Sequence, residues 1–166
     1  IIVNATDKGT VRLILNNASI SNTTTAPIKV LDAKKVILTL ADNTTNTITD
    51  SSRLSTEEDY SAAIYSKEDL IINGNGTLNV NAGYRNGIKS TDDCIIVSGT
   101  LNITSTEDGI IGKDLCGVVA GDININAGSD GIKSTYDTDT TKGNVIIEGG
   151  NITIKASNDG IQAENI

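Results

Sequence analysis

Four short polar side chains precede copies of one Gly-Ile pair, and they are the residues whose types and spacing most suggest chemistry. They are Asn86, Asp108, Asp130 and Asp159. Carboxylate and amide oxygens are preferred ligands of Ca²⁺, at about 2.3–2.6 Å. If a repeated fold stacks the four positions in a column about 4.8 Å apart, oxygens of adjacent residues can lie on opposite sides of one ion. The spacing therefore predicts calcium ligands at these positions.

The column can be explained with a bound cation or without one. Carboxylates about 5 Å apart repel each other by roughly 3 kcal/mol at an effective dielectric near 20, and a bound cation would offset this repulsion. Asp before Gly is also common in turns, where its side chain accepts hydrogen bonds from nearby backbone N–H groups. A column of solvated turns whose acids cap the backbone is therefore the alternative to a calcium site.

A second set of acids follows the copies of the repeat at a less regular distance. Its members are Glu68, Asp69, Asp92, Asp93, Asp114, Asp137 and Asp139. A polar insertion of seven residues, Tyr136 to Lys142, falls among the last of them. Asp92, Asp93, Asp114 and Asp137 are therefore candidate calcium ligands, and ordinary solubilising turn residues are an equal alternative.

Cationic side chains recur on what should be the outward face of the repeated strand. Lys89 and Lys133 occupy the same position of the repeat, Tyr65 occupies it in an earlier copy, and Arg85 lies beside it. Together with bound Ca²⁺, such a strip would attract the carboxylates of an acidic sugar. The alternative is that the lysines merely cover a sheet face with their aliphatic stems.

These side chains must be positioned by a repeated unit of short strands. The Ile residues of the repeat are Ile64, Ile88, Ile110, Ile132 and Ile161, at spacings of 24, 22, 22 and 29 residues. Each is followed by two further segments with an alternating apolar and polar pattern, typical of strands. Self-similarity at such a period indicates a solenoid, and crossover connections between parallel strands are right-handed. The sequence predicts an all-β, right-handed parallel β-helix with three short strands per coil of about 22 residues.

The repeat extends over the whole chain as one predicted domain, 1–166. Residues 63–166 form regular coils, and residues 1–62 form degenerate N-terminal coils with strands near 11–15, 28–30, 36–40 and 47–49. Residues 51–61 are expected to form a surface excursion. Because a solenoid end needs a cap and none is recognisable after Ile161, we expect the chain to be part of a longer protein.

Composition excludes two classes of partner. The formal net charge is −8, which argues against nucleic acid because phosphate contacts need clustered Lys and Arg. No run of 18 apolar residues is present, so the sequence predicts no membrane span. The sequence specifies no oligomeric state.

The composition also suits the predicted core. Ile, Val and Leu dominate a hydrophobic content of 37%, and Phe, Trp and Met are absent, which is typical of a narrow core of stacked β-branched side chains.

Several stretches of the chain resemble one known family. The run Ala-Ile-Tyr-Ser-Lys-Glu-Asp-Leu-Ile-Ile-Asn-Gly-Asn-Gly-Thr-Leu at 63–78, the Asp-Gly-Ile copies and Asp-Gly-Ile-Gln-Ala at 159–163 are similar to the carbohydrate-binding β-helix family of clostridial cell-surface proteins. The resemblance implies a pectate-lyase-like fold, an extracellular or cell-surface location, calcium binding, and affinity for polygalacturonate and cellulose. Its Asp-Gly-Ile acids correspond to Asp108, Asp130 and Asp159, whereas Asn86 replaces the first acid.

The residues and the resemblance together predict a binding module. We expect calcium-dependent, non-catalytic binding of an acidic plant cell-wall polysaccharide such as polygalacturonate or pectin, and of cellulose by resemblance. A calcium-dependent polysaccharide lyase is the first alternative, with Lys89, Lys133 or Arg85 as the base if a neighbour lowers its pKa. A structural surface stalk or adhesin is the second.

Overall fold

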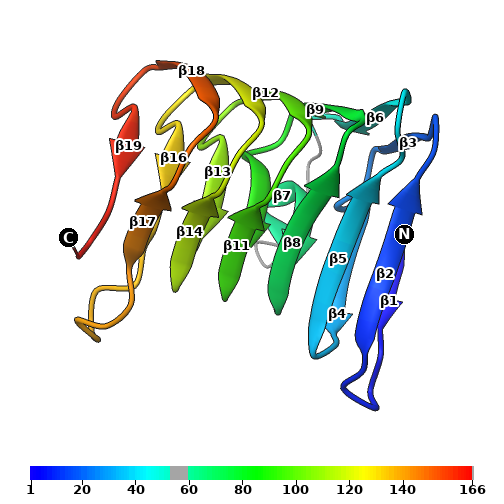
Figure 1. Ribbon diagram of the computed structural model, residues 1–166, viewed down its shortest axis with the longest axis horizontal. Helices are drawn as coiled ribbons and strands as arrows, with labels where there is room; N and C mark the ends of the chain where they lie inside the picture. Colours follow the sequence, from blue (N-terminus) through cyan, green and yellow to red (C-terminus); the bar gives the residue numbers. More distant parts are fainter. Residues whose placement is uncertain (53–59, 166) are drawn as a thin grey trace.

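The computed structural model describes residues 1–52 and 60–165, and the regular structure in these ranges is made of short strands (Figure 1). The first three coils contain β1 (Ile2–Asn4), β2 (Thr10–Leu15), β3 (Ser19–Asn22), β4 (Ile28–Asp32), β5 (Lys35–Leu40), β6 (Thr45–Asp50), β7 (Ala62–Ser66), β8 (Asp69–Gly74) and β9 (Thr77–Ala82). The remaining strands are β10 (Asn86–Ser90), β11 (Asp93–Ile96), β12 (Thr100–Ser105), β13 (Ile110–Gly112), β14 (Leu115–Val118), β15 (Asp122–Ala127), β16 (Ile132–Lys133), β17 (Asn144–Ile147), β18 (Asn151–Ala156) and β19 (Ile161–Gln162).

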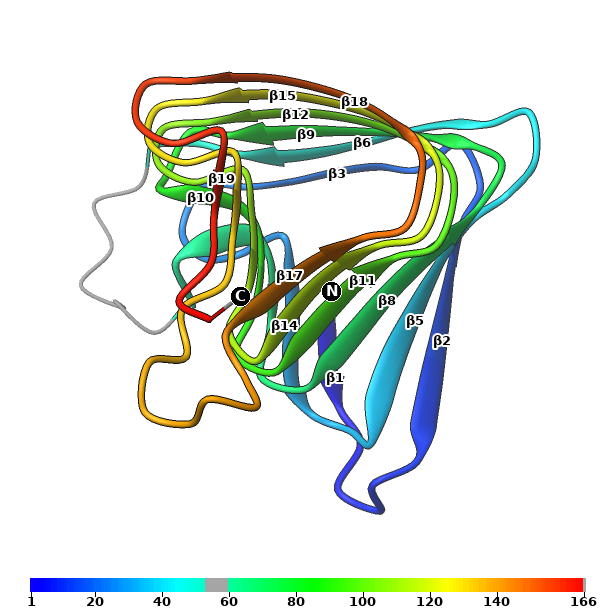
Figure 2. The ribbon, with the colours of Figure 1, turned by 60° about the vertical axis from the view of Figure 1, so that its left-hand side comes forward.

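Every third strand pairs in parallel with its counterpart one coil away. The result is three sheets, ordered β1-β4-β7-β10-β13-β16-β19, β17-β14-β11-β8-β5-β2 and β18-β15-β12-β9-β6-β3. Figure 2 looks along the stack and shows the coils lying on one another. We refer to these as the first, second and third sheets. The predicted right-handed parallel β-helix with three strands per coil is confirmed, in about six turns.

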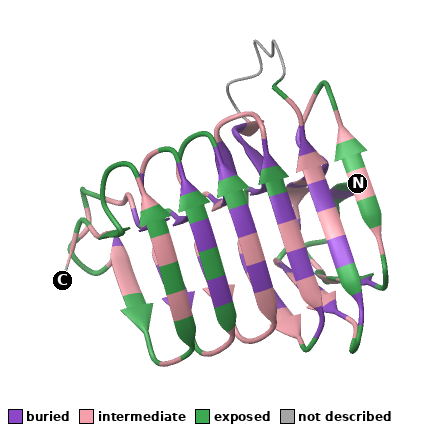
Figure 3. Cartoon of the chain, turned by 90° about the horizontal axis from the view of Figure 1, so that it is seen from above, coloured by how far each residue is buried: buried purple, intermediate pink, exposed green. Residues whose placement is uncertain are grey.

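The register of the sheets follows the sequence repeat. Ile88 pairs with Ile110, and Ile110 pairs in turn with Ile132. The Ile residues of the repeat therefore form one column, in which Ile64, Ile88, Ile110 and Ile132 are buried and Ile161 in the last coil is 47% exposed. Burial alternates along the strands, as Figure 3 shows by its coloured bands. This alternation follows from the two-residue period of a strand, which places successive side chains on opposite faces.

The N-terminal region forms coils as complete as the later ones. Strands β2, β4, β5 and β6 occur where the sequence predicts them, whereas β1 and β3 were not predicted. Both are short, and β3 has a single aliphatic residue, Ile20, so the sequence offers too little alternation to reveal them. The predicted surface excursion at 51–61 lies mostly outside the described residues. None of the residues described forms a helix of the length and hydropathy needed to cross a membrane.

Candidate functional site

The column of Asn86, Asp108, Asp130 and Asp159 exists as predicted, and its oxygens are engaged by the backbone. We call these four residues the Asx column. The Asn86 Oδ1 accepts the N–H of Asp108 at 3.0 Å, and the Asp108 Oδ1 accepts the N–H of Asp130 at 2.9 Å. The Asp130 Oδ1 accepts the N–H of Asp159 at 3.0 Å. Asn86, Asp108 and Asp130 therefore each cap the backbone of the next coil, which ties adjacent turns together.

The glycine after each column residue permits this close stacking. A Cβ on Gly109 would lie 2.5 Å from the carbonyl oxygen of Gly131, and a Cβ on Gly131 would lie 2.5 Å from that of Gly160. No real Cβ approaches an oxygen so closely, so a side chain at either position would push the coils apart. The stacking of coils therefore explains both residues of the pair: the Asx side chain binds the next coil, and the glycine lets that coil approach.

Asp130 is the most constrained member of the column. Its side chain is buried, its Oδ1 also accepts the Asn158 amide at 2.7 Å, and its Oδ2 accepts the Lys133 ammonium at 2.7 Å. Burial alone would raise the pKa of Asp130, but the bonds from Lys133, Asp159 and Asn158 outweigh it and hold the pKa below its usual value. A calcium ion at this position would have to replace these bonds.

A different set of acids is brought together by the turn between the first and second sheets. Oxygens of Asp69, Asp92 and Asp93 lie within 4.8 Å of one another, and within the described ranges this is the one group of three acids so arranged. We call these three residues the acidic cluster. The pairing of Leu70 with Cys94 places the residues before them, Asp69 and Asp93, side by side at the starts of β8 and β11.

A buried serine fixes the turn that carries the cluster. The Ser90 hydroxyl accepts the N–H of Asp92 at 3.1 Å and donates to the carbonyl of Glu68 at 2.9 Å. Ser90 therefore holds two consecutive coils at the level where the acids project. Asp92 and Asp93 were predicted candidates, whereas Asp69 was noted only as part of the irregular second set.

The carboxylates of the acidic cluster disfavour one another's ionisation. Partial burial, the charge of Asp69 and contact with Asp114 raise the pKa of Asp92 to about 6. Burial and the charges of Asp69 and Asp114 also raise the pKa of Asp93. Such crowding is what a divalent cation neutralises, so the acidic cluster is the part of the described molecule best arranged to hold one.

The other two predicted acids of this set have different surroundings. Asp114 lies one coil beyond Asp92 and forms a short ion pair with Lys142, and its side chain is 12% exposed. Asp137 lies exposed in the segment between β16 and β17 and is not a member of the acidic cluster. Asp114 is thus a further potential ligand that already has a counter-ion.

The predicted cationic strip is present on the first sheet, but its lysines differ. Lys89 is half-buried, and its ammonium lies 3.3 Å from the Ser61 hydroxyl. Burial, followed by the charge of Arg85, lowers the pKa of Lys89. For Lys133, burial would lower the pKa, but the hydrogen bond to Asp130 outweighs it and raises the pKa. Lys89 is thus the more available of the two.

The other two predicted residues of the cationic strip are Arg85, which lies at its edge, and Tyr65, which is buried. The Arg85 guanidinium lies 3.9 Å from Glu107 and over the Tyr84 ring at 5.6 Å. Tyr65 is only 5% exposed, and its ring packs edge-on against Tyr60 with centroids 5.3 Å apart. The Tyr65 ring therefore does not present a face to solvent on which a sugar could stack.

Sequence reasoning assigned no role to two lysines at the insertion. The ammonium groups of Lys113 and Lys142 each lie 4.9 Å from the centroid of the Tyr136 ring. The one sequence signal was the placement of an aromatic residue and a lysine at the two ends of the polar insertion.

Comparisons with known proteins identify the family of this chain. A model of the family described as carbohydrate-binding domain-containing protein matches residues 1–166. A protein of that description from Acetivibrio thermocellus is 39% identical over 95 residues, covering 55% of this chain and 33% of its own length, so the match spans about a third of that relative.

A solved structure supports the fold and the family. The polysaccharide lyase-like protein from C. thermocellum, as a gadolinium derivative, superposes with a TM-score of 0.91 at 31% identity, covering 99% of this chain and 77% of that one. The resemblance noted in the sequence is confirmed by these matches. The chain belongs to the family of carbohydrate-binding domain-containing proteins, and it carries this family's sequence on a polysaccharide lyase-like parallel β-helix.

Proposed function

We propose that this protein binds an acidic plant cell-wall polysaccharide, such as polygalacturonate or pectin, in a calcium-dependent and non-catalytic manner. The observation that carries the proposal is the acidic cluster, with oxygens of three carboxylates within 4.8 Å, next to a series of lysines on a carbohydrate-binding β-helix. Membership of the family supports polysaccharide binding. The calcium ion and the acidic nature of the sugar are inferences from the charges on this surface.

Calcium is the ion that the cluster suits best. Its ligands here would be the side-chain oxygens of Asp69, Asp92 and Asp93, with Asp114 as a fourth, and Ca²⁺ prefers such hard oxygen ligands. An acidic set in which one pKa is raised to about 6 gains most from a divalent charge.

An acidic polymer fits the charges around the cluster. A bound ion would leave coordination positions for a uronate carboxylate, and the neighbouring lysines would meet further carboxylates along the polymer. This local cationic surface is needed because the formal net charge of −8 would otherwise repel an anionic ligand. A polymer of plant cell walls is encountered outside the cell, so we place the protein in the extracellular space or on the cell surface.

The test is retention on polygalacturonate with calcium and with EDTA. We expect the protein to be retained with calcium, released by EDTA and retained again when calcium is restored. The double variant Asp92→Asn, Asp93→Asn should lose retention, whereas Asp122→Asn on the third sheet should keep it. Retention that survives EDTA would remove calcium from the proposal, and no retention under any condition would favour a structural stalk.

One observation favours a lyase as the second candidate. The pKa of Lys89 is lowered by burial and by Arg85, which is the change that a lysine base needs at alkaline pH. Lyase activity would release unsaturated products that absorb in the ultraviolet. Absorbance that rises with calcium at alkaline pH, and is lost in Lys89→Ala, would replace the binding module by an enzyme.

A further inference from the structure

The insertion between β16 and β17 is held firmly against the preceding coil. We call residues 135–143 the insertion loop. The N–H of Tyr136 donates to the Lys113 carbonyl at 3.0 Å, and the N–H of Gly143 donates to the Asp114 carbonyl at 2.7 Å. Both ends of the loop are therefore fixed to the connection between β13 and β14.

The loop is also held by Asn165, which follows β19. The Asn165 amide donates to the carbonyls of Lys142 at 2.6 Å and Asp139 at 3.3 Å, and lies 3.4 Å from that of Tyr136. Gly143 has a φ of 75°, and a Cβ there would lie 2.1 Å from the Tyr136 carbonyl oxygen. A side chain at this position would thus open the loop. These bonds give the Tyr136 ring a defined place.

The fixed ring is contacted by two ammonium groups with different surroundings. Lys142 contacts both the Tyr136 ring and the carboxylate of Asp114. Lys113 is exposed, its ammonium lies 4.9 Å from the ring centroid, and it makes no ion pair with an acid in the part of the chain that the structure describes. A lysine without an acidic partner in so acidic a protein is available to an anion from outside.

The ring and lysines connect the cationic strip to the acidic cluster. The N–H of Lys113 donates to the carbonyl of Ser90, the residue after Lys89, at 3.1 Å, so Lys113 extends the strip. Lys142 continues from Tyr136 to Asp114, which contacts Asp92. A polymer that follows this surface would meet Lys113, then the ring, then the ion.

We propose that Tyr136, Lys113 and Lys142 form a uronate-binding subsite, which holds the sugar next to the one bound at the ion. The Tyr136 ring offers a half-exposed aromatic surface to the C–H groups of a pyranose, and Lys113 pairs with the carboxylate of the same sugar. Lys142 keeps the ring and Asp114 in fixed relation. The subsite rests on the proposed function, because it extends the same surface.

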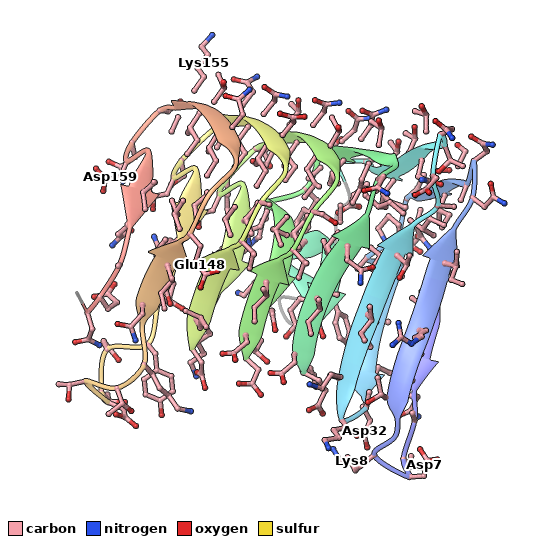
Figure 4. The ribbon with its side chains drawn as sticks, in the orientation of Figure 1. Asp7, Lys8, Asp32, Glu148, Lys155 and Asp159 are labelled. Carbon is pink, nitrogen blue, oxygen red and sulfur yellow. The ribbon has the colours of Figure 1, made fainter. Side chains whose placement is uncertain are left out.

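The experiment measures calcium affinity and polymer affinity separately. Variants Lys113→Gln and Tyr136→Leu are compared with Lys155→Gln, which removes the same charge from the third sheet. Figure 4 shows Lys155 on the opposite side of the solenoid from the insertion loop. Calcium affinity is measured without sugar, and oligogalacturonate affinity is measured by calorimetry at saturating calcium.

The outcomes distinguish the subsite from the function on which it rests. We expect Lys113→Gln and Tyr136→Leu each to weaken oligogalacturonate about fivefold to tenfold, as loss of a charged or aromatic contact does. Calcium affinity without sugar should not change, and Lys155→Gln should behave as wild type. If wild type binds and all three variants bind equally, the subsite is wrong. If wild type does not bind, the proposed function itself is wrong. Because Lys113 is exposed, its replacement tests the subsite even if Tyr136→Leu disturbs the loop.

Discussion

Two sets of Asp and Asn side chains in this molecule are brought together by the stacking of coils but have opposite surroundings. In the Asx column, one side-chain oxygen each of Asn86, Asp108 and Asp130 accepts a backbone N–H of the next coil, as Asp130 does from Asp159 at 3.0 Å. In the acidic cluster, carboxylates face one another, with oxygens of Asp69, Asp92 and Asp93 within 4.8 Å. Stacking similar residues therefore produces a structural ladder where donors meet them and a charged site where donors do not.

The pKa values express the same contrast. The pKa of Asp130 is lowered because donors from Lys133, Asp159 and Asn158 outweigh its burial. The pKa of Asp92 is raised to about 6 by burial and by neighbouring carboxylates. Ionisation of Asp130 thus stabilises the fold, whereas ionisation of Asp92 opposes it unless a cation is present. This contrast supports the proposal that the acidic cluster, and not the Asx column, binds the calcium ion.

Replacing Asp130 should give the largest effect on stability. Asp130→Ala should lower the free energy of unfolding by about 2–3 kcal/mol, because a buried charge-assisted network loses its acceptor. Asp130→Asn keeps an oxygen for the Asp159 N–H and should cost about 1 kcal/mol. Chemical denaturation measures both. If either variant instead abolished calcium binding while the protein stayed folded, the Asx column and not the acidic cluster would be the metal site.

Acid should act on the two regions in opposite directions. The folded pKa of Asp92 lies above the value of about 3.9 expected in an unfolded chain, so the folded state takes up the proton first. Without calcium, stability should therefore rise as pH falls from 7 through about 6. The stabilisation from Asp130 should be lost only as pH falls through about 3.9 and below.

Melting temperature against pH in EDTA tests this order. The rise toward pH 5 should disappear in Asp92→Asn, and calcium affinity of the wild type should fall over the same interval because protons compete with the ion. A melting temperature that decreases steadily from pH 7 would mean that the cluster carboxylates are not crowded in solution.

Replacing Lys142 should give the smallest effect, but it should change calcium affinity and oligogalacturonate affinity in opposite directions. Lys142→Met takes a positive charge away from Asp114, so calcium should bind about two- to fivefold more tightly, because contacts between exposed charges contribute little. Oligogalacturonate affinity should decrease in the same variant, since the ring loses its support. Lys155→Met is the matched control. Tighter calcium binding with unchanged oligogalacturonate affinity at saturating calcium would show that Lys142 acts on the ion alone.

Much of the architecture was predictable because a solenoid repeats its sequence signals. The Ile column, aligned as Ile88 with Ile110 and Ile132, follows from the 22-residue spacing. The stacking of Asp108 on Asp130 follows from the same spacing. The unpredicted β1 and β3 show the limit, since a strand of three or four residues carries little pattern of its own.

The candidate site was less predictable than the fold. The regular Asx column gave the stronger sequence signal for calcium, yet its oxygens are bonded to backbone N–H groups. Asp69 joins the acidic cluster although its register is irregular in the sequence. Tyr65 lies at a strip position but is buried against Tyr60. The alternation of a strand predicts an exposed side chain there, whereas all residues of β7 are buried.

The sequence by itself determined the coil, the register and which acids lie above one another, because a constant repeat length forces equivalent residues into columns. Only the tertiary structure decided which of those acids meet a donor, since this depends on the direction of each N–H in turns that a repeat does not specify. It also decided that the insertion loop returns to Lys113 and Asp114. Contacts of this kind join residues about 25 positions apart through a single loop, and a segment present once in the chain leaves no repeated pattern from which they could be inferred.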